Sequence, residues 1–247
     1  MIGNSPMPYP QIWLMAHDIL NKGCFSILSP QEREYSNAIR NISRKIEFIR
    51  TRSALRYLLS RLCDNNIDFC QWRFGQNPYG KLFIEKAIEF PRMEFSISHT
   101  PGITAIAVSE NTSVGIDVES CSFPRISEIP ADVALCKKER LALSALPEHE
   151  QWRYFLELWT VKEAYAKYAG TGVFTEFTSM YVTADGHHVP LCQKNERWAP
   201  ADINVYTTET VVNREEFIMS LVTSEGGAHS PEIIELKSME QLISSKL

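Results

Sequence analysis

The sequence predicts an α+β fold built as two halves, each of which runs from helices into strands. The helical and strand-like patterns follow the order helices, strands, helices, strands, which is typical of α+β proteins. The chain has 247 residues, which is more than one average domain and less than two. No Gly/Ser-rich linker or low-complexity segment divides it. We therefore expect two halves that join near residues 110–125 and pack closely together.

The first half is predicted to begin with helices and to continue with short strands. Ser29-Pro30-Gln31-Glu32 forms a capping box with proline at the first helical position, so a helix should begin at Pro30. Apolar residues with an approximate 3.6-residue period predict a longer helix from Ile42 to Cys63. Asn77-Pro78-Tyr79-Gly80 predicts a turn. The predicted strands that follow are Leu82–Ile84, Glu94–Ser98, Ile103–Val108 and Val114–Glu119.

The second half repeats this order. Helical patterns cover Lys137–Leu146 and Glu148–Ala169, and Gly170 suits the residue that follows a helix end in the left-handed conformation. Alternating patterns predict strands at Thr178–Thr183, Ile203–Thr208, Glu216–Thr223 and Glu232–Leu236, and a short closing helix could follow.

The composition excludes several classes of protein. With 44% hydrophobic and 22% charged residues, the chain is an ordinary globular protein and not a disordered, collagen-like or coiled-coil one. A net charge of −5 argues against a general nucleic-acid binder. The first ten residues lack the pattern of a signal peptide, and no apolar run reaches the ~20 residues that span a membrane, so we expect a cytoplasmic protein without membrane contact.

The six cysteines are scattered without a CxxC pair, so we expect buried, reduced thiols and no zinc site. They are Cys24, Cys63, Cys70, Cys121, Cys136 and Cys192.

One segment is strongly basic. Between Pro30 and Arg61 eight basic residues stand against three acidic ones, a local net charge of +5. This segment is either a solvated helix face, as most charge runs are, or a site where several guanidinium groups, among them Arg52 and Arg56, converge on a multiply charged anion. The basic residues are Arg33, Arg40, Arg44, Lys45, Arg50, Arg52, Arg56 and Arg61.

Two carboxylates lie on one face of a predicted strand. In Val114–Glu119, Asp117 and Glu119 are two residues apart and therefore point the same way. Carboxylates this close repel each other unless a cation lies between them, and a hard divalent ion with oxygen ligands would fill that role. The alternative is a strand whose acidic face simply points into water.

A predicted helix supplies a third carboxylate. Glu163 and Lys167 share a helix face and could form a surface ion pair. Trp159 lies on the same face, and a large aromatic ring beside charged groups indicates a partly buried site. The serine and histidine of Phe95-Ser96-Ile97-Ser98-His99 belong to no Gly-x-Ser-x-Gly elbow, which disfavours a serine hydrolase.

Taken together, these motifs resemble the 4′-phosphopantetheinyl transferase superfamily. The resemblance spans about residues 77–172 and is to its broad-specificity, surfactin-synthetase-activating type. The motifs are Asn77-Pro78-Tyr79-Gly80-Lys81, Phe95-Ser96-Ile97-Ser98-His99, Gly115-Ile116-Asp117-Val118-Glu119, and Trp159 with Lys162-Glu163-Ala164 and Lys167. The resemblance implies a monomer built from a pseudo-twofold pair of similar α+β halves, with the active site at their junction. Residues 1–115 would form the half on the coenzyme A side, and residues 116–247 the half with the metal-binding helix.

The resemblance also implies an activity, a cofactor and partners. Such enzymes transfer the 4′-phosphopantetheine arm of coenzyme A to a serine of an apo acyl or peptidyl carrier protein and release 3′,5′-adenosine bisphosphate. The resemblance places Asp117, Glu119 and Glu163 around Mg²⁺, which Mn²⁺ could replace. Glu163, directly or through a metal-bound water, is the expected general base, and Lys167 stabilises charge on the phosphate.

The same resemblance assigns the residues that hold coenzyme A. Lys81, Ser98 and His99 are expected at its phosphates, and the basic segment, Arg52 included, at its 3′-phosphate. Two alternatives remain: a catalytically silent relative that binds carrier proteins or coenzyme A, and an unrelated Mg²⁺-dependent nucleotide enzyme, although the sequence has no Gly-x-x-x-x-Gly-Lys-Ser/Thr loop.

Overall fold

The structure is a computed structural model that describes residues 10–17, 24–63, 67–85, 92–122, 129–172, 175–182, 190–194, 197–200, 203–224 and 230–236. The helices are α1 (Cys24–Ile27), α2 (Pro30–Ala38), α3 (Ile42–Leu62), α4 (Ala131–Ala134), α5 (Lys137–Ala145) and α6 (Glu148–Ala169), with 3₁₀ helices η1 (Phe69–Gln71) and η4 (Phe177–Ser179). The strands are β1 (Gln11–Ala16), β2 (Phe74–Gln76), β3 (Leu82–Ile84), β4 (Met93–Thr100), β5 (Ile103–Glu110), β6 (Val114–Ser120), β7 (Met180–Val182), β8 (Pro190–Lys194), β9 (Arg197–Pro200), β10 (Ile203–Val212), β11 (Glu215–Ser224) and β12 (Glu232–Leu236).

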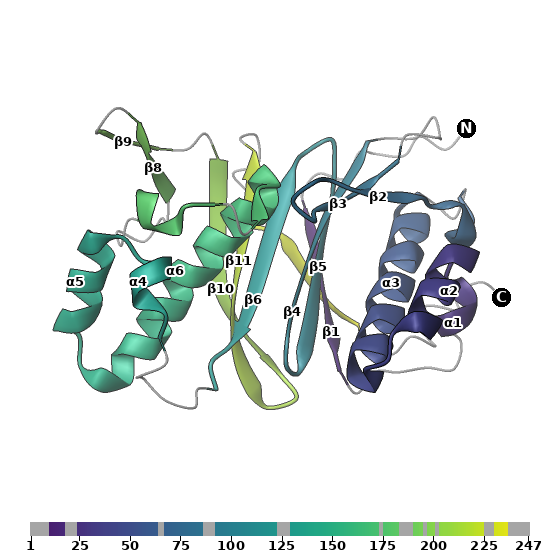
Figure 1. Ribbon diagram of the computed structural model, residues 1–247, viewed down its shortest axis with the longest axis horizontal. Helices are drawn as coiled ribbons and strands as arrows, with labels where there is room; N and C mark the ends of the chain where they lie inside the picture. The colour runs from purple at the N-terminus through teal and green to yellow at the C-terminus, as the bar shows by residue number, and fades with distance from the viewer. Residues whose placement is uncertain are drawn as a thin grey trace.

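Two sheets lie at the centre of the molecule and helices cover their outer faces (Figure 1). One sheet has the strand order β12-β1-β5-β4 and the other β10-β11-β6. Figure 1 shows α1, α2 and α3 at the end of the first sheet and α4, α5 and α6 at the end of the second. This arrangement confirms the predicted α+β class.

The hydrophobic core follows these layers. One cluster joins α3 to the first sheet and includes Leu55, Leu58 and Ile106. A second fills the space between the two sheets with residues such as Ile12 and Ile116, and further clusters lie under α6. β5 is buried on both faces along nearly its whole length, and its sequence is accordingly a nearly continuous apolar run.

Serine side chains join the two sheets where β4 meets β6. The backbone N–H of Ile116 donates to Ser96 Oγ at 3.1 Å, and that of Val118 donates to Ser98 Oγ at 3.4 Å. The hydroxyl groups therefore satisfy backbone donors of β6 on the side where it pairs with none of the described strands. They fix the face of β6 that carries the acidic residues against β4.

Most of the predicted elements are confirmed. α2 begins at Pro30 with both hydrogen bonds of the capping box, and α3, β3, α6 and β12 match their expected bounds closely. Gly170 follows α6 with φ of 72°. β1 was not predicted, and the expected closing helix lies outside the described residues.

The end of the described chain crosses between the halves. β12 pairs in parallel with β1, so a strand from the second half completes the sheet of the first. The predicted boundary between the halves, at 115/116, falls inside β6. Because β12 also pairs with β1, this boundary stays a proposal.

The cysteines and the helices bear on two further expectations. The five cysteines whose side chains are described are free thiols, but Cys70 is exposed and Cys121 only partly buried, so the expectation of burial is wrong for these two. Cys70 lies in the short helix η1, whose three residues are all at least partly exposed, and Cys121 directly follows β6. Among the described residues no helix is long and apolar enough to cross a membrane.

Candidate active site

Asp117 is the most deeply buried carboxylate of β6. Its Oδ1 accepts hydrogen bonds from Lys167 Nζ at 2.6 Å and from Ser98 Oγ at 2.8 Å. Its Oδ2 is buried and has no hydrogen-bond partner within the described part of the chain. A buried carboxylate oxygen without a donor is costly, so this oxygen is a candidate ligand for a bound cation.

Glu119 lies two residues further along β6, on the same face. It accepts a hydrogen bond from Thr100 Oγ1 at 3.1 Å and one from Trp159 Nε1 at 3.4 Å. Burial, and then the charge of Asp117, raise the pKa of its carboxyl above the usual range. The predicted pairing of the two acids on one face is therefore confirmed, and the solvent-facing alternative is wrong.

Glu163 adds a third acidic group from α6. The pKa of Glu163 is raised to about 7, first by burial and then by the charge of Asp117, while Lys167 acts in the opposite direction. Lys167 itself bonds to Asp117 and to Ser98 Oγ at 2.8 Å, rather than forming the simple helix-surface pair with Glu163. One cation thus faces three carboxyl groups, and the site carries an excess of negative charge.

The three carboxyl groups do not yet surround a common point. Within the described residues, no three His, Cys, Asp or Glu side chains are grouped closely enough to hold a metal ion as they stand. The electrostatic coupling of Glu163 to both Asp117 and Glu119 nevertheless places them in one site.

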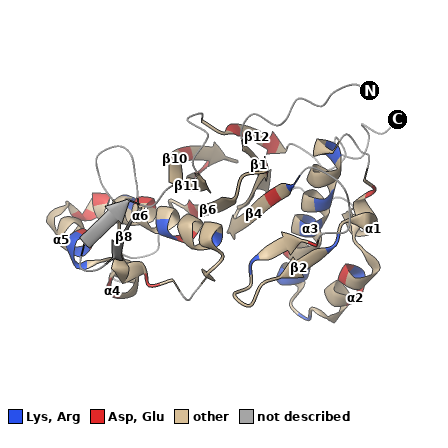
Figure 2. Ribbon diagram, turned by 90° about the horizontal axis from the view of Figure 1, so that it is seen from above, with Lys and Arg blue, Asp and Glu red and all other residues tan. Residues whose placement is uncertain are grey.

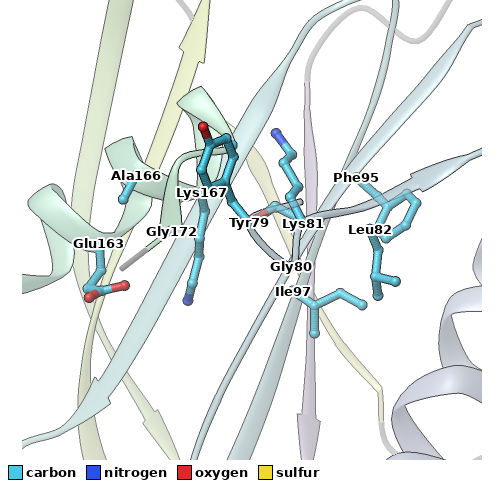
Figure 3. Close-up of a pocket in the computed structure, with 12 residues that line it drawn as sticks. Tyr79, Gly80, Lys81, Leu82, Phe95, Ile97, Glu163, Ala166, Lys167 and Gly172 are labelled. Atoms are coloured by element: carbon cyan, nitrogen blue, oxygen red, sulfur yellow. The ribbon is translucent and has the colours of Figure 1, made fainter. Parts of the chain in front are cut away.

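A cavity of about 280 Å³ opens beside these residues. Figure 3 shows Glu163 and Lys167 on one side of it, and the turn between β2 and β3 with Phe95 and Ile97 of β4 on the other. Its lining residues are Tyr79, Gly80, Lys81, Leu82, Phe95, Ser96, Ile97, Glu163, Ala166, Lys167, Gly170 and Gly172. The motifs from the two halves therefore meet at one cavity.

The turn between β2 and β3 is bound to the C-terminal end of α6. Asn77 Nδ2 donates to Gly170 O at 2.8 Å, and Lys81 Nζ donates to Tyr168 O at 3.0 Å. Gly172 has φ of 53°, and a Cβ there would lie 2.9 Å from Tyr79 O, so both the conformation and the contact require glycine. Lys81, expected at phosphates, lines the cavity, but its ammonium group donates to the carbonyls of Tyr168 on α6 and Val114 on β6. Burial lowers the pKa of Lys81.

His99 is not brought to the carboxylates. It follows Ser98 on β4 and so points to the opposite face, where its Nε2 lies 2.9 Å from Glu47 Oε1 of α3. Its side chain is 52% exposed.

The basic residues between Pro30 and Arg61 differ in role: some bind other parts of the fold, and some line a second cavity. Arg56 is buried and donates to Glu32 at 2.6 Å and to the carbonyls of Phe69 and Trp72. It also lines the second cavity, so its share in an anion site stays a prediction. Arg52 stacks over the rings of Phe48 and Phe74 and lines a cavity of about 880 Å³. Figure 2 shows the basic residues spread along α3.

Two residues that sequence reasoning left without a role belong to the site or its support. Thr100 contacts Glu119 and lies on the same face of β4 as Ser96 and Ser98, so the alternation of hydroxyl residues was the available signal. Lys162, the neighbour of Glu163, is fully buried against Glu139. Nothing in the local pattern distinguished it from a surface lysine.

Comparison with known proteins relates this geometry to a family. A family model described as 4'-phosphopantetheinyl transferase superfamily matches residues 113–222. The 4'-phosphopantetheinyl transferase Sfp of Bacillus subtilis (strain 168) is 32% identical over 165 residues, which cover 66% of this chain and 69% of that protein. The 4'-phosphopantetheinyl transferase gsp of Aneurinibacillus migulanus is 30% identical over 162 residues, covering 62% and 64%.

A solved structure was also compared. A crystal structure of a holo-(acyl-carrier-protein) synthase from Bacillus anthracis in complex with CoA superposes with a TM-score of 0.34 and 22% identity, covering 47% of this chain and 96% of that one.

Proposed function

Because this chain belongs to the 4′-phosphopantetheinyl transferase superfamily, we propose that it transfers the 4′-phosphopantetheine arm of coenzyme A to a serine of an apo acyl or peptidyl carrier protein. The other product is 3′,5′-adenosine bisphosphate. The observation that carries the proposal is that Glu163 and Lys167 of α6 line a cavity and interact electrostatically with Asp117 and Glu119 of β6. Displacement at a phosphorus of a pyrophosphate needs this combination of bound cation, proton acceptor and charge stabilisation.

Asp117, Glu119 and Glu163 would hold Mg²⁺, or Mn²⁺ in its place. Their oxygen-only donor set is what these hard cations prefer. The buried Oδ2 of Asp117, which accepts no hydrogen bond from the described residues, would be one of the ligands. Binding would draw the three carboxyl groups closer together, and the charge of the cation would offset their mutual repulsion. When bound, the ion neutralises pyrophosphate oxygens and makes the phosphorus more electrophilic.

Glu163 and Lys167 would act on the reacting atoms. Glu163, with a pKa near neutrality, is suited to accept the proton of the carrier serine. The serine oxygen then forms a bond to phosphorus while the bond to the adenosine bisphosphate oxygen breaks. Lys167, held by Ser98 and Asp117, would stabilise the negative charge on the transferred phosphate.

Coenzyme A would extend across the hairpin formed by β2 and β3. The smaller cavity, lined by Lys81 and Lys167, suits the pyrophosphate, and the larger one, lined by Arg52 and Arg73, suits the nucleotide with its 3′-phosphate. Both cavities include Leu82, so they adjoin at β3. Ser98 would act through Asp117 and Lys167, and His99, at the far face of β4, would reach phosphate only from the α3 side.

Both halves contribute residues to the site, so we expect a monomer to be active. We place it in the cytoplasm, where coenzyme A and carrier proteins are available.

The test is a transfer assay with coenzyme A, Mg²⁺ and a panel of apo carrier proteins. We expect the mass of at least one carrier to increase by one phosphopantetheine, and no increase when its acceptor serine is replaced by alanine. Asp117→Asn is the matched enzyme control, because it keeps the size of the side chain and removes its charge. Binding of coenzyme A by calorimetry without any transfer would instead support the catalytically silent relative, and preference for ATP would support an unrelated nucleotide enzyme.

A further inference from the structure

Lys162 forms a closed cluster of polar contacts inside the second half. Its side chain is fully buried, and Nζ lies 2.6 Å from Glu139 Oε2, 2.9 Å from the carbonyl oxygens of Ala134 and Phe177, and 3.1 Å from that of Met180. Glu139 is fully buried too. Its two oxygens accept hydrogen bonds from the backbone N–H groups of Cys136 and Val182. Lys162 therefore ties α6 to α4, α5, η4 and β7.

A buried ion pair contributes little net stability to a protein core. The cost of removing two charges from water often cancels their attraction, and apolar residues of similar size would stabilise a core at least as well. What the pair supplies is direction, because hydrogen bonds to several elements fix the rotation of α6 about its axis. Lys162 and Glu163 are consecutive, so their side chains leave the helix about 100° apart. Anchoring Lys162 in the core thereby sets the direction of Glu163 toward β6.

A second route leads from Lys162 to Glu119. The carbonyl of Phe177 accepts from Lys162, and the ring of Phe177 packs edge-on against Trp159 with 5.3 Å between centroids. Trp159 Nε1 in turn donates to Glu119 Oε1 at 3.4 Å. The position of the indole ring, and so of its hydrogen bond to the carboxylate, depends on where η4 is held.

We infer that Lys162, through its pair with Glu139, is a positioning residue that sets the directions of Glu163 and Glu119 for binding a divalent cation. The inference rests on the proposed function, because it takes these carboxylates as metal ligands. It assigns no contact with substrate to Lys162. Removal of residues that orient metal ligands costs about 10–100-fold in metal affinity.

The test compares metal binding in the folded protein. Glu139→Gln/Lys162→Met removes both buried charges together, so neither is left uncompensated. Binding of Mn²⁺ is followed by electron paramagnetic resonance with coenzyme A present, at a temperature where circular dichroism shows a native protein. We expect Mn²⁺ to bind at least ~10-fold more weakly than to the wild type. A folded double variant with wild-type Mn²⁺ affinity would overturn the inference, because a purely structural role changes the folded fraction and not the affinity of the folded state.

A second pair of variants tests the route through the indole. Trp159→Phe keeps both buried charges and removes the hydrogen bond to Glu119, and we expect Mn²⁺ binding to weaken several-fold. Trp152→Phe, on the same helix, removes a hydrogen bond of the same kind to the carbonyl of Cys121 and should leave Mn²⁺ binding unchanged. If the double variant does not fold, this pair decides: equal affinities in the two variants overturn the inference. A wild-type protein that transfers the arm while all variants bind Mn²⁺ equally refutes the positioning role alone, whereas a wild type that neither binds Mn²⁺ nor transfers refutes the proposed function as well.

Discussion

Two of the ion pairs of α6, Lys162–Glu139 and Lys167–Asp117, differ in how completely their hydrogen-bonding groups are satisfied. Lys162 and Glu139 are both 0% exposed, and each is surrounded by hydrogen-bond partners from neighbouring elements. Lys167 is 27% exposed, and its partner Asp117 has a buried oxygen to which none of the described residues donates, while two more carboxyl groups lie nearby. The contrast separates two roles: a closed set of contacts maintains the geometry of the helix, whereas an open, negatively charged set is suited to bind a cation.

The largest effect on the free energy of unfolding is expected when the closed pair, Lys162–Glu139, is broken. Glu139→Ala leaves the ammonium group of Lys162 without a counter-charge and the N–H groups of Cys136 and Val182 without acceptors. Removing one partner of a buried pair costs about 3–5 kcal/mol. Urea denaturation checks this value. A loss below about 1 kcal/mol would show that the pair is not closed in solution.

The largest effect on activity is expected when the open pair, Lys167–Asp117, is changed. Asp117→Asn removes the charge that holds Lys167 and, in our proposal, a metal ligand. Losing one preorganised electrostatic group in an active site lowers turnover by about 10²–10³-fold. The rate of carrier modification measures this loss, and circular dichroism checks that the variant is folded. Near-normal turnover would mean that Asp117 lies outside the site.

The stability of the protein should also depend on pH through Glu163, which belongs to the open set of contacts. The folded pKa of Glu163, about 7, lies above its ordinary value of 4.5, so the protonated form favours the folded state. This contribution to stability is complete below pH 4.5 and is lost as the pH rises through about 7. Glu163→Gln does not titrate, and at pH 8 without divalent ions we expect it to be more stable than the wild type by about 1–3 kcal/mol.

Urea denaturation at pH 5 and pH 8, with EDTA present, provides the measurement. The same variant should be inactive at both pH values, so stability and activity change in opposite directions. Equal stabilities of variant and wild type at pH 8 would contradict the raised pKa.

The smallest effect is expected at an exposed pair in the same half. Arg140 and Asp132 are 2.8 Å apart, but their side chains are 40% and 94% exposed. Exposed pairs contribute about 0–1 kcal/mol, so Arg140→Ala should change neither the unfolding midpoint nor the transfer rate appreciably. A loss comparable to that of Glu139→Ala would remove the distinction between closed and exposed pairs.

Much of the secondary structure could be predicted because its signals are local. The capping box at Ser29, the period of α3 and the glycine after α6 each act within a few residues. β1 could not be predicted in this way: a short apolar run suits a buried strand or a buried helix equally. Only its pairing with β5 and β12, which are distant in the sequence, decides that it is a strand.

The candidate site divides along the same line. The sequence by itself determined which side chains share a face, Asp117 with Glu119 on a strand and Glu163 with Lys167 on a helix, because strand and helix periods are properties of the local backbone. Only the tertiary structure decided their partners. Lys167 bonds to Asp117, Arg56 is committed to the fold, and Lys162 is buried, because these contacts depend on how elements far apart in the chain pack and exclude water.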